Sequence, residues 1–213
     1  MKKAIIMIAL VTFSVSNSLA QESTTTDNRN KLSFGVKIGA NYSNVYDSDG
    51  EDFVADGKFG IAGGVFAVIP LGSYIGVQPE VLFSQKGFKS EGSFLGTDYK
   101  MTRTTDFIDV PIFLSVKPVE FVSLLFGPQF SYLLKRTDKF TGGSLDATQE
   151  EEFENEDLTK NIFGLTGGAD INIDHFVIGV RAGWDLKKNV GSDDTTTPRY
   201  KNMWYQATVG FKF

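Results

Sequence analysis

The sequence has no cysteine and only one histidine among its 213 residues. The absence of cysteine excludes disulfides, thiol catalysis and metal sites built from thiolates. A nucleophile would also lack a general base, because the single histidine, His175, lies in a predicted two-residue turn. The 26 acidic residues outnumber the 21 basic ones, which argues against nucleic acid as a partner. We therefore expect a non-enzymatic protein without cofactor or metal ligands.

Long apolar runs are also scarce, with one exception at the start of the chain. Lys2 and Lys3 are followed by an apolar run that ends at Phe13 and by small residues up to Ala20. This order is typical of a cleaved secretory signal peptide. An uncleaved N-terminal anchor is the competing interpretation, but the run is much shorter than the ~20 residues of a membrane-spanning helix. We expect a signal peptide at residues 1–20, a flexible polar lead-in at 21–30 and one folded domain at 31–213.

Aromatic residues and glycine, in contrast, are abundant: the chain contains 19 Phe, 7 Tyr, 2 Trp and 22 Gly. Both favour strands and close packing within sheets. Apolar residues such as Val36 and Ile38 alternate with small or polar ones such as Lys37 and Gly39, which is the period of a half-buried strand. The same alternation predicts eight strands, at residues 32–43, 58–69, 74–87, 104–117, 121–135, 161–173, 176–187 and 203–213.

The predicted connections alternate between short and long. Up-and-down strands with this rhythm place every short turn at one end of the sheet and every long loop at the other. Outer-membrane barrels have the same asymmetry, with short periplasmic turns and long extracellular loops. An even number of strands also returns both termini to the short-turn, periplasmic end. The short connections are 70–73, 118–120 and 174–175, and the long ones are 44–57, 88–103, 136–160 and 188–201.

The volume of the side chains indicates which face points outward. Each strand offers about five large apolar residues on one face, and an eight-stranded barrel has an interior just wide enough for side chains to fill. The small and polar face therefore fits the lumen, and the apolar face meets lipid. Aromatic residues near the strand ends, such as Phe176 and Trp184, would form the interfacial girdles. We predict an all-β fold: an eight-stranded antiparallel up-and-down transmembrane β-barrel in the outer membrane.

Charged residues on the inner face need partners or water, since an isolated buried charge is costly. Glu80 and Asp109 lie on neighbouring predicted strands, and Arg181 can reach them across the lumen. We interpret the set as an ion-pair plug; a proton path or a substrate site is the functional alternative. The predicted network comprises Gln78, Glu80, Asp109, Arg181 and Asp185, and the same face also holds Lys37, Lys117, Gln129 and Asp170.

The long loops hold 17 of the 26 acidic residues. The segment 47–52 has three aspartates and a glycine, which suits calcium, but it lacks the spacing of an EF-hand. The segment 150–157 is a simpler case of a solvated charge run. Binding of a divalent ion by either loop is left open, and no metal ligand is assigned.

Several motifs carry a family resemblance over nearly all of the predicted mature chain. They include Gly35-Val-Lys-Ile-Gly-Ala-Asn41, Phe107-Ile-Asp-Val-Pro-Ile-Phe-Leu114 and Phe126-Gly-Pro-Gln-Phe-Ser-Tyr132. With these motifs the chain resembles the outer-membrane β-barrel domain family of Bacteroidota, which includes PorT-like proteins. The resemblance implies the barrel architecture and says little about activity. The last strand also resembles the signal read by barrel-assembly machinery, through Tyr205, Val209, Phe211 and Phe213.

Three classes of function remain open. The first is a small integral barrel with a structural role or with loops that bind an extracellular partner. The second, suggested by the PorT-like resemblance, is an accessory component of a protein secretion or assembly system. The third is a soluble periplasmic barrel that binds an apolar ligand, as lipocalins do. The expected partners are outer-membrane lipid, the barrel-assembly machinery and, for the first two classes, a protein that contacts the loops.

Overall fold

The computed structural model describes residues 28–46, 55–94, 97–142, 145–152, 161–187 and 200–213. The predicted signal peptide, most of the lead-in and the acidic segment 47–52 lie outside these ranges. Within them, no helix is long and apolar enough to cross a membrane. The described elements are η1 (Asn28–Asn30), β1 (Ser33–Tyr46), β2 (Ala55–Pro70), β3 (Ile75–Phe94), β4 (Thr97–Val119), β5 (Val122–Gly142), β6 (Leu145–Glu152), β7 (Asn161–Ile173), β8 (Phe176–Asp185) and β9 (Lys201–Lys212).

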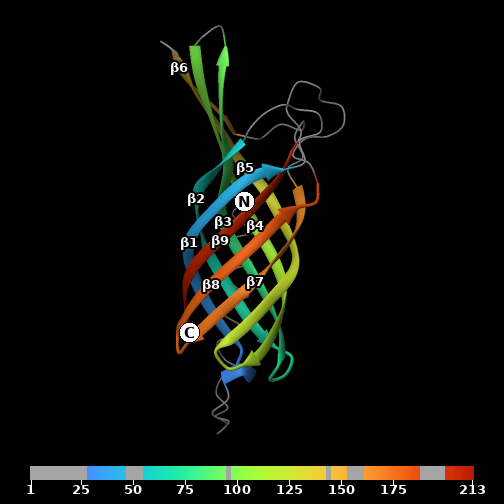
Figure 1. The fold of residues 1–213 in the computed structure, drawn as a ribbon. Coiled ribbons are helices and arrows are strands. Elements are labelled where there is room, and N and C mark those ends of the chain that lie inside the picture. The colour runs from blue at the N-terminus through green and yellow to red at the C-terminus, as the bar shows by residue number, and fades with distance from the viewer. Residues whose placement is uncertain (1–27, 47–54, 95–96, 143–144, 153–160, 188–199) are drawn as a thin grey trace, which may run out of the picture.

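Eight of the described strands close into a barrel (Figure 1). Each pairs antiparallel with its neighbours in the order β4-β3-β2-β1-β9-β8-β7-β5, and pairing between β4 and β5 joins the two ends of the sheet. Closure leaves the barrel wall without a free sheet edge, which would be costly in lipid. The predicted all-β, eight-stranded antiparallel barrel is therefore confirmed.

The predicted strand positions are confirmed to within about three residues, except at the loop ends of β3, β4 and β5. Residues 88–103 and 136–160 were predicted as loops, and this is wrong for much of both segments. β3 continues to Phe94 and β4 begins at Thr97, so the two strands extend as a paired hairpin. β5 continues to Gly142 and pairs with a ninth strand, β6. These extensions lack a face of alternating large apolar residues, so the pattern that located the wall strands is absent there.

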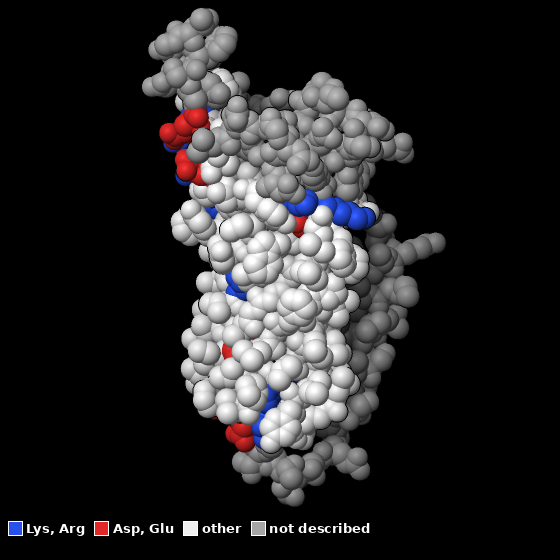
Figure 2. Space-filling model, turned by 45° about the vertical axis from the view of Figure 1, so that its right-hand side comes forward, with Lys and Arg blue, Asp and Glu red and all other residues white. Residues whose placement is uncertain are grey.

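The large apolar side chains of the wall point outward. Ile38, Val65 and Val180 are 72 %, 52 % and 56 % exposed. Most of the wall in Figure 2 is uncharged, and the charged atoms in this view gather mainly towards the two ends of the molecule. The predicted girdle residues Phe176 and Trp184 are also exposed. An apolar surface of this extent is stable when it faces lipid and not when it faces water.

The inner face is less uniformly small than the sequence predicted. Phe66, with 4 % exposure, and Trp204, with 2 %, lie in the lumen. Each large ring covers a glycine directly across the strand pair, Phe66 opposite Gly35 and Trp204 opposite Gly183. A Cβ added at Gly183 would lie 2.2 Å from the indole of Trp204, so the absence of a side chain makes room for the ring.

Candidate functional site

A cluster of five polar side chains crosses the lumen in the half nearer the short turns. It joins Lys37 of β1, Gln78 and Glu80 of β3, Asp170 of β7 and Arg181 of β8. The Lys37 Nζ donates a 2.7 Å hydrogen bond to Glu80 Oε1, and the Arg181 Nη1 lies 2.8 Å from Asp170 Oδ1. The Gln78 amide donates to both carboxylates, at 3.0 and 3.1 Å. Two cations therefore face two anions, and we call these five residues the lower cluster.

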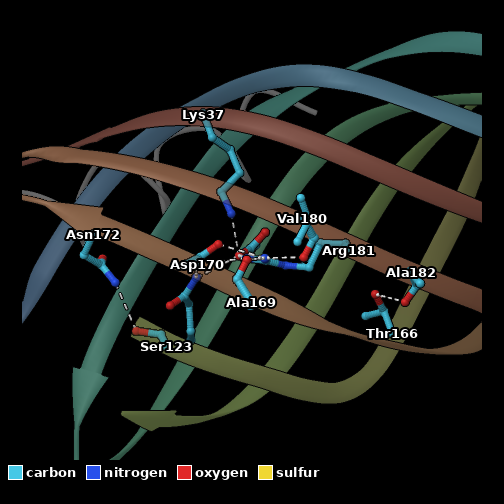
Figure 3. A network of polar contacts seen from close by, with 11 residues as sticks. Lys37, Ser123, Thr166, Ala169, Asp170, Asn172, Val180, Arg181 and Ala182 are labelled. Carbon is cyan, nitrogen blue, oxygen red and sulfur yellow. Dashed lines mark hydrogen bonds and ion pairs between the residues drawn. The ribbon is translucent and has the colours of Figure 1, made fainter. Parts of the chain in front are cut away.

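The lower cluster is almost dry and tightly enclosed. The side chains of its four charged residues are 3 % exposed or less. Figure 3 shows Lys37 and Arg181 converging near Asp170 from different strands. Gly179 lies directly opposite Asp170 on the neighbouring strand, and a Cβ there would lie 2.5 Å from Asp170 Oδ1. The glycine therefore leaves space for the ion pair to form.

A second cluster lies further towards the loop end, around Lys86 of β3. Its ammonium lies 3.0 Å from Asp109 Oδ2, 3.8 Å from the ring centroid of Trp204 and 4.8 Å from that of Phe107. Cation–π contacts of this kind are strongest where water is excluded. The Lys86 Nζ also donates a long hydrogen bond, 3.5 Å, to Ser131 Oγ. These residues form the upper cluster.

Asp185 lies at the loop end of β8 and belongs to neither cluster. Asn202 donates a 2.7 Å side-chain hydrogen bond to Asp185 Oδ2, while Asp185 Oδ1 is buried without a hydrogen-bond partner in the described part of the chain. Nearer the middle of the lumen, the Asn41 amide donates to Ser84 and accepts from Gln206. Neutral hydrogen bonds therefore lie between the charged groups.

A further ion pair, between buried Arg103 and partly buried Asp138, lies where the hairpin of β3 and β4 begins. Arg103 donates two hydrogen bonds of 2.8 Å to the two oxygens of Asp138, and a longer one, 3.4 Å, to the Tyr200 hydroxyl. This paired geometry is the strongest that a guanidinium makes with a carboxylate. Both Arg103 and Asp138 lie in segments predicted to be loops, which is why the sequence analysis did not single them out.

The structure brings together three of the five predicted network residues. Gln78, Glu80 and Arg181 meet in the lower cluster, whereas Asp109 pairs with Lys86 and Asp185 bonds Asn202. Sequence reasoning missed Lys86. The sequence does contain a signal for it: Lys86 has the same parity as Gln78 and Glu80 along β3, so its side chain points into the lumen with theirs.

The described side chains in the lumen form ion pairs and fill its space, and they do not present a reactive group. The His175 imidazole contacts the backbone oxygen of Lys212 at 2.9 Å and stacks on Phe211, far from either cluster along the barrel. Among the described residues, no group of three or more histidine, aspartate or glutamate side chains is placed to hold a metal ion. Two recesses flank the filled lumen, with about 440 Å³ and 330 Å³ of empty space, including part that is open to solvent.

The barrel architecture agrees with the match to a known protein family. A family model described as "Outer membrane protein beta-barrel domain" matches residues 19–191. Similar solved structures include the attachment invasion locus protein Ail of Yersinia pestis, with 16 % identity over 86 % of this chain and 99 % of that one and a TM-score of 0.47. Neisserial surface protein A has 14 % identity over 84 % of this chain and 97 % of that one, with a TM-score of 0.46. No curated protein sequence matches the chain.

Proposed function

The chain belongs to the outer membrane protein β-barrel domain family, and from this premise we propose that it acts as a closed scaffold that displays a sheet for binding at its loop end. One observation carries the proposal: the lumen is filled by balanced ion pairs, whereas the wall strands continue well beyond the barrel. A filled lumen does not favour a passive pore. Within the ranges that the structure describes, the projecting sheet is then the part best placed to meet a partner.

The projecting sheet consists of the loop-end parts of β3, β4, β5 and β6. Pairing between β3 and β4 continues to Phe94 and Thr97, and pairing between β5 and β6 continues to Gly142 and Leu145. In Figure 1 this part stands above the rest of the wall. Continuous strand pairing from wall to tip holds such a sheet more rigidly than a loop of the same length would be held.

An exposed ion pair joins the two strands of the β3–β4 hairpin. Glu91 and Lys100 lie directly opposite each other in the strand pair, and the Lys100 ammonium donates a hydrogen bond to the Glu91 carboxylate. This bond lowers the pKa of the Glu91 carboxyl and raises that of the Lys100 ammonium. Both side chains are more than half exposed, so the pair contributes little stability and leaves its charges accessible.

Trimming the projecting sheet tests the proposal. Ser90 and Met101 form a strand pair, so residues 91–100 can be replaced by Asn-Gly, which suits a two-residue hairpin turn. We expect the trimmed protein to insert and to keep its heat-modifiable gel mobility, because the wall is untouched. We also expect it to fail to restore the envelope phenotype of a deletion strain. Full restoration by the trimmed protein would contradict a binding role for the sheet and leave a purely structural one.

An accessory role in protein secretion is the second candidate, and the resemblance to PorT-like proteins of Bacteroidota supports it. A deletion strain that retains secreted cargo in the periplasm would favour this role over a general scaffold. The soluble, lipocalin-like alternative does not fit, because the lumen is polar and filled while the apolar side chains point outward. Partition into detergent-solubilised outer membrane is the direct measurement.

We also propose the export and assembly signals that the sequence predicts. Residues 1–20 would be removed on export, and both termini would lie in the periplasm with the short turns. Support for an assembly signal comes from β9, where one face of the strand points outward. The residues of this face are Tyr205, Val209 and Phe211 of β9 and Phe213 directly after it, which are 52 %, 55 %, 43 % and 68 % exposed.

Phe213→Ala should reduce the amount of folded protein in the outer membrane of cells while changing the stability of refolded protein by only about 1 kcal/mol. The backbone bonds of Phe213 with Phe34, at 2.9 and 3.3 Å, do not require the side chain. Phe121→Ala is the matched control, since Phe121 is 58 % exposed at the same end of the barrel but outside β9. Equal losses of folded protein for the two variants would refute a signal specific to β9.

A further inference from the structure

The projecting sheet ends in a strand that pairs on one side only. In the described part of the chain, β6 pairs with β5 over all eight of its residues and stands last in the order of the sheet. The side of β6 that faces away from β5 therefore presents backbone N–H and C=O groups to which no described strand bonds, and we call this side the open edge. On the opposite flank, only residues 91–94 of β3 extend beyond the pairing with β2. The open edge of β6 is thus the longer one.

The open edge lacks most of the features that keep exposed strands apart. Natural edge strands are commonly bulged, or marked with lysine or proline, because an unpaired edge recruits other strands. The pairing of β6 with β5 runs in one register throughout. The sequence of β6, Leu145-Asp-Ala-Thr-Gln-Glu-Glu-Glu152, contains neither proline nor lysine. Negative charge is the one protective feature that it carries, so the edge can accept a strand whose charge fits.

The charge of β6 is divided unequally between the two faces of the strand. Alternate residues of a strand share a face. One set contains three acids and the other contains one, and neither contains a basic residue. The first set is Asp146, Thr148, Glu150 and Glu152, and the second is Leu145, Ala147, Gln149 and Glu151. A strand that complements this edge alternates basic residues with apolar or neutral ones.

The pairing with β5 shows which chemistry β6 accepts as a neighbour. Lys135 and Arg136 of β5 lie directly opposite Glu152 and Glu151 in the strand pair. Opposite charges in such positions stabilise a strand pair, and like charges destabilise it. A second copy of β6 would bring four more acids and no base to the edge, which disfavours pairing between two copies of this chain. A basic strand meets the opposite condition.

We propose that the open edge of β6 binds an extended segment of a partner protein, in which lysine or arginine alternates with apolar residues, as an added strand. The inference rests on the binding role proposed for the projecting sheet and names the chemistry of its partner. Backbone hydrogen bonds would hold the segment, and its basic residues would select it. In Figure 1, β6 stands above the barrel wall, beyond the part of the surface that meets lipid.

A synthetic peptide that alternates lysine and valine over the length of β6 tests the edge on the refolded full chain in a non-ionic detergent. Alternate residues of an antiparallel strand bond to opposite neighbours. We therefore expect the peptide to slow hydrogen exchange, measured by NMR, at the alternate amides of β6 that point away from β5. A peptide methylated on two consecutive central backbone nitrogens keeps the charge and loses donors on both of its edges. No protection by the first peptide, or equal protection by both, would overturn the proposal.

Glu150→Gln/Glu152→Gln should raise the Kd of the unmethylated peptide roughly tenfold, because it removes two charges from one face of the edge. The matched control is Glu120→Gln/Asp174→Asn, which removes the same charge from the short turns. Asparagine tolerates the positive φ of Asp174. The control should bind the peptide as the unaltered chain does. Equal weakening in the two variants would mean that net charge alone attracts the peptide, and the proposal would fail.

Complementation separates this inference from the proposed function. In the deletion strain, a chain with Glu150→Lys/Glu152→Lys should insert with heat-modifiable mobility and should fail to restore the envelope phenotype. Restoration by this chain, together with failure of the trimmed protein, would mean that the projecting sheet binds through another part, and only this inference would be lost. Restoration by both chains would remove the proposed function as well.

Discussion

Replacing Arg181 with methionine is expected to lower the free energy of unfolding of the refolded barrel by about 3–5 kcal/mol, the usual cost of breaking a buried ion pair from one side. Methionine keeps much of the length of the side chain, so the loss comes from charge rather than from a cavity. Glu80 and Asp170 would remain buried with Lys37 as the only cation of the lower cluster. Urea unfolding in detergent measures the change, and unheated gels show whether heat resistance is lost.

A second substitution shows whether charge balance is the cause. Arg181→Met/Asp170→Asn removes one cation and one anion, so it should recover a large part of the lost stability. The free energy of unfolding could instead change by less than about 1 kcal/mol for Arg181→Met. An effect of that size is typical of surface substitutions, so it would mean that water solvates the two carboxylates. The lower cluster would then not stabilise the barrel, and a role in ligand or proton binding would become the better interpretation.

The sequence predicted which residues enter the lumen much better than it predicted which of them meet. Alternation alone assigned Lys37, Glu80, Asp170 and Arg181 to the inner face. Contacts between them depend on the register of each strand pair and on the stagger of strands around a barrel, which alternation does not specify. Asp109 pairs directly opposite Leu82 on β3, further towards the loop end than Glu80. It therefore reaches Lys86 instead of Arg181.

The same limit applies to the rings in the lumen. The parity of the predicted strand at 203–213 places Trp204 on the inner face, but an eight-stranded barrel has little room for an indole. Only the register shows that Gly183 lies directly opposite and leaves the space. Gly179 and Gly183 of β8 thus leave space for particular neighbours, Asp170 and Trp204. A sequence read strand by strand cannot reveal that pairing.

The projecting sheet could not be predicted for a different reason. Wall strands have one lipid-facing side, and this imposes a strong apolar period on their sequences. Beyond the membrane both sides of a hairpin can be polar, so the period disappears although the strand pairing continues. The long connections therefore looked like loops, and the Arg103–Asp138 pair at their base stayed hidden.

Val180→Arg should destabilise the barrel by about 2–4 kcal/mol if the apolar face meets lipid, because a charge on that face is most costly at the middle of the bilayer. Val180 lies midway along β8 and is 56 % exposed. The control is Ile173→Arg, at the short-turn end of β7 with 54 % exposure, where the expected cost is about 0–1 kcal/mol. Urea unfolding in phospholipid vesicles compares the two. Equal costs at both positions would show that depth in a bilayer does not govern this face, and the lipid-facing assignment would be wrong.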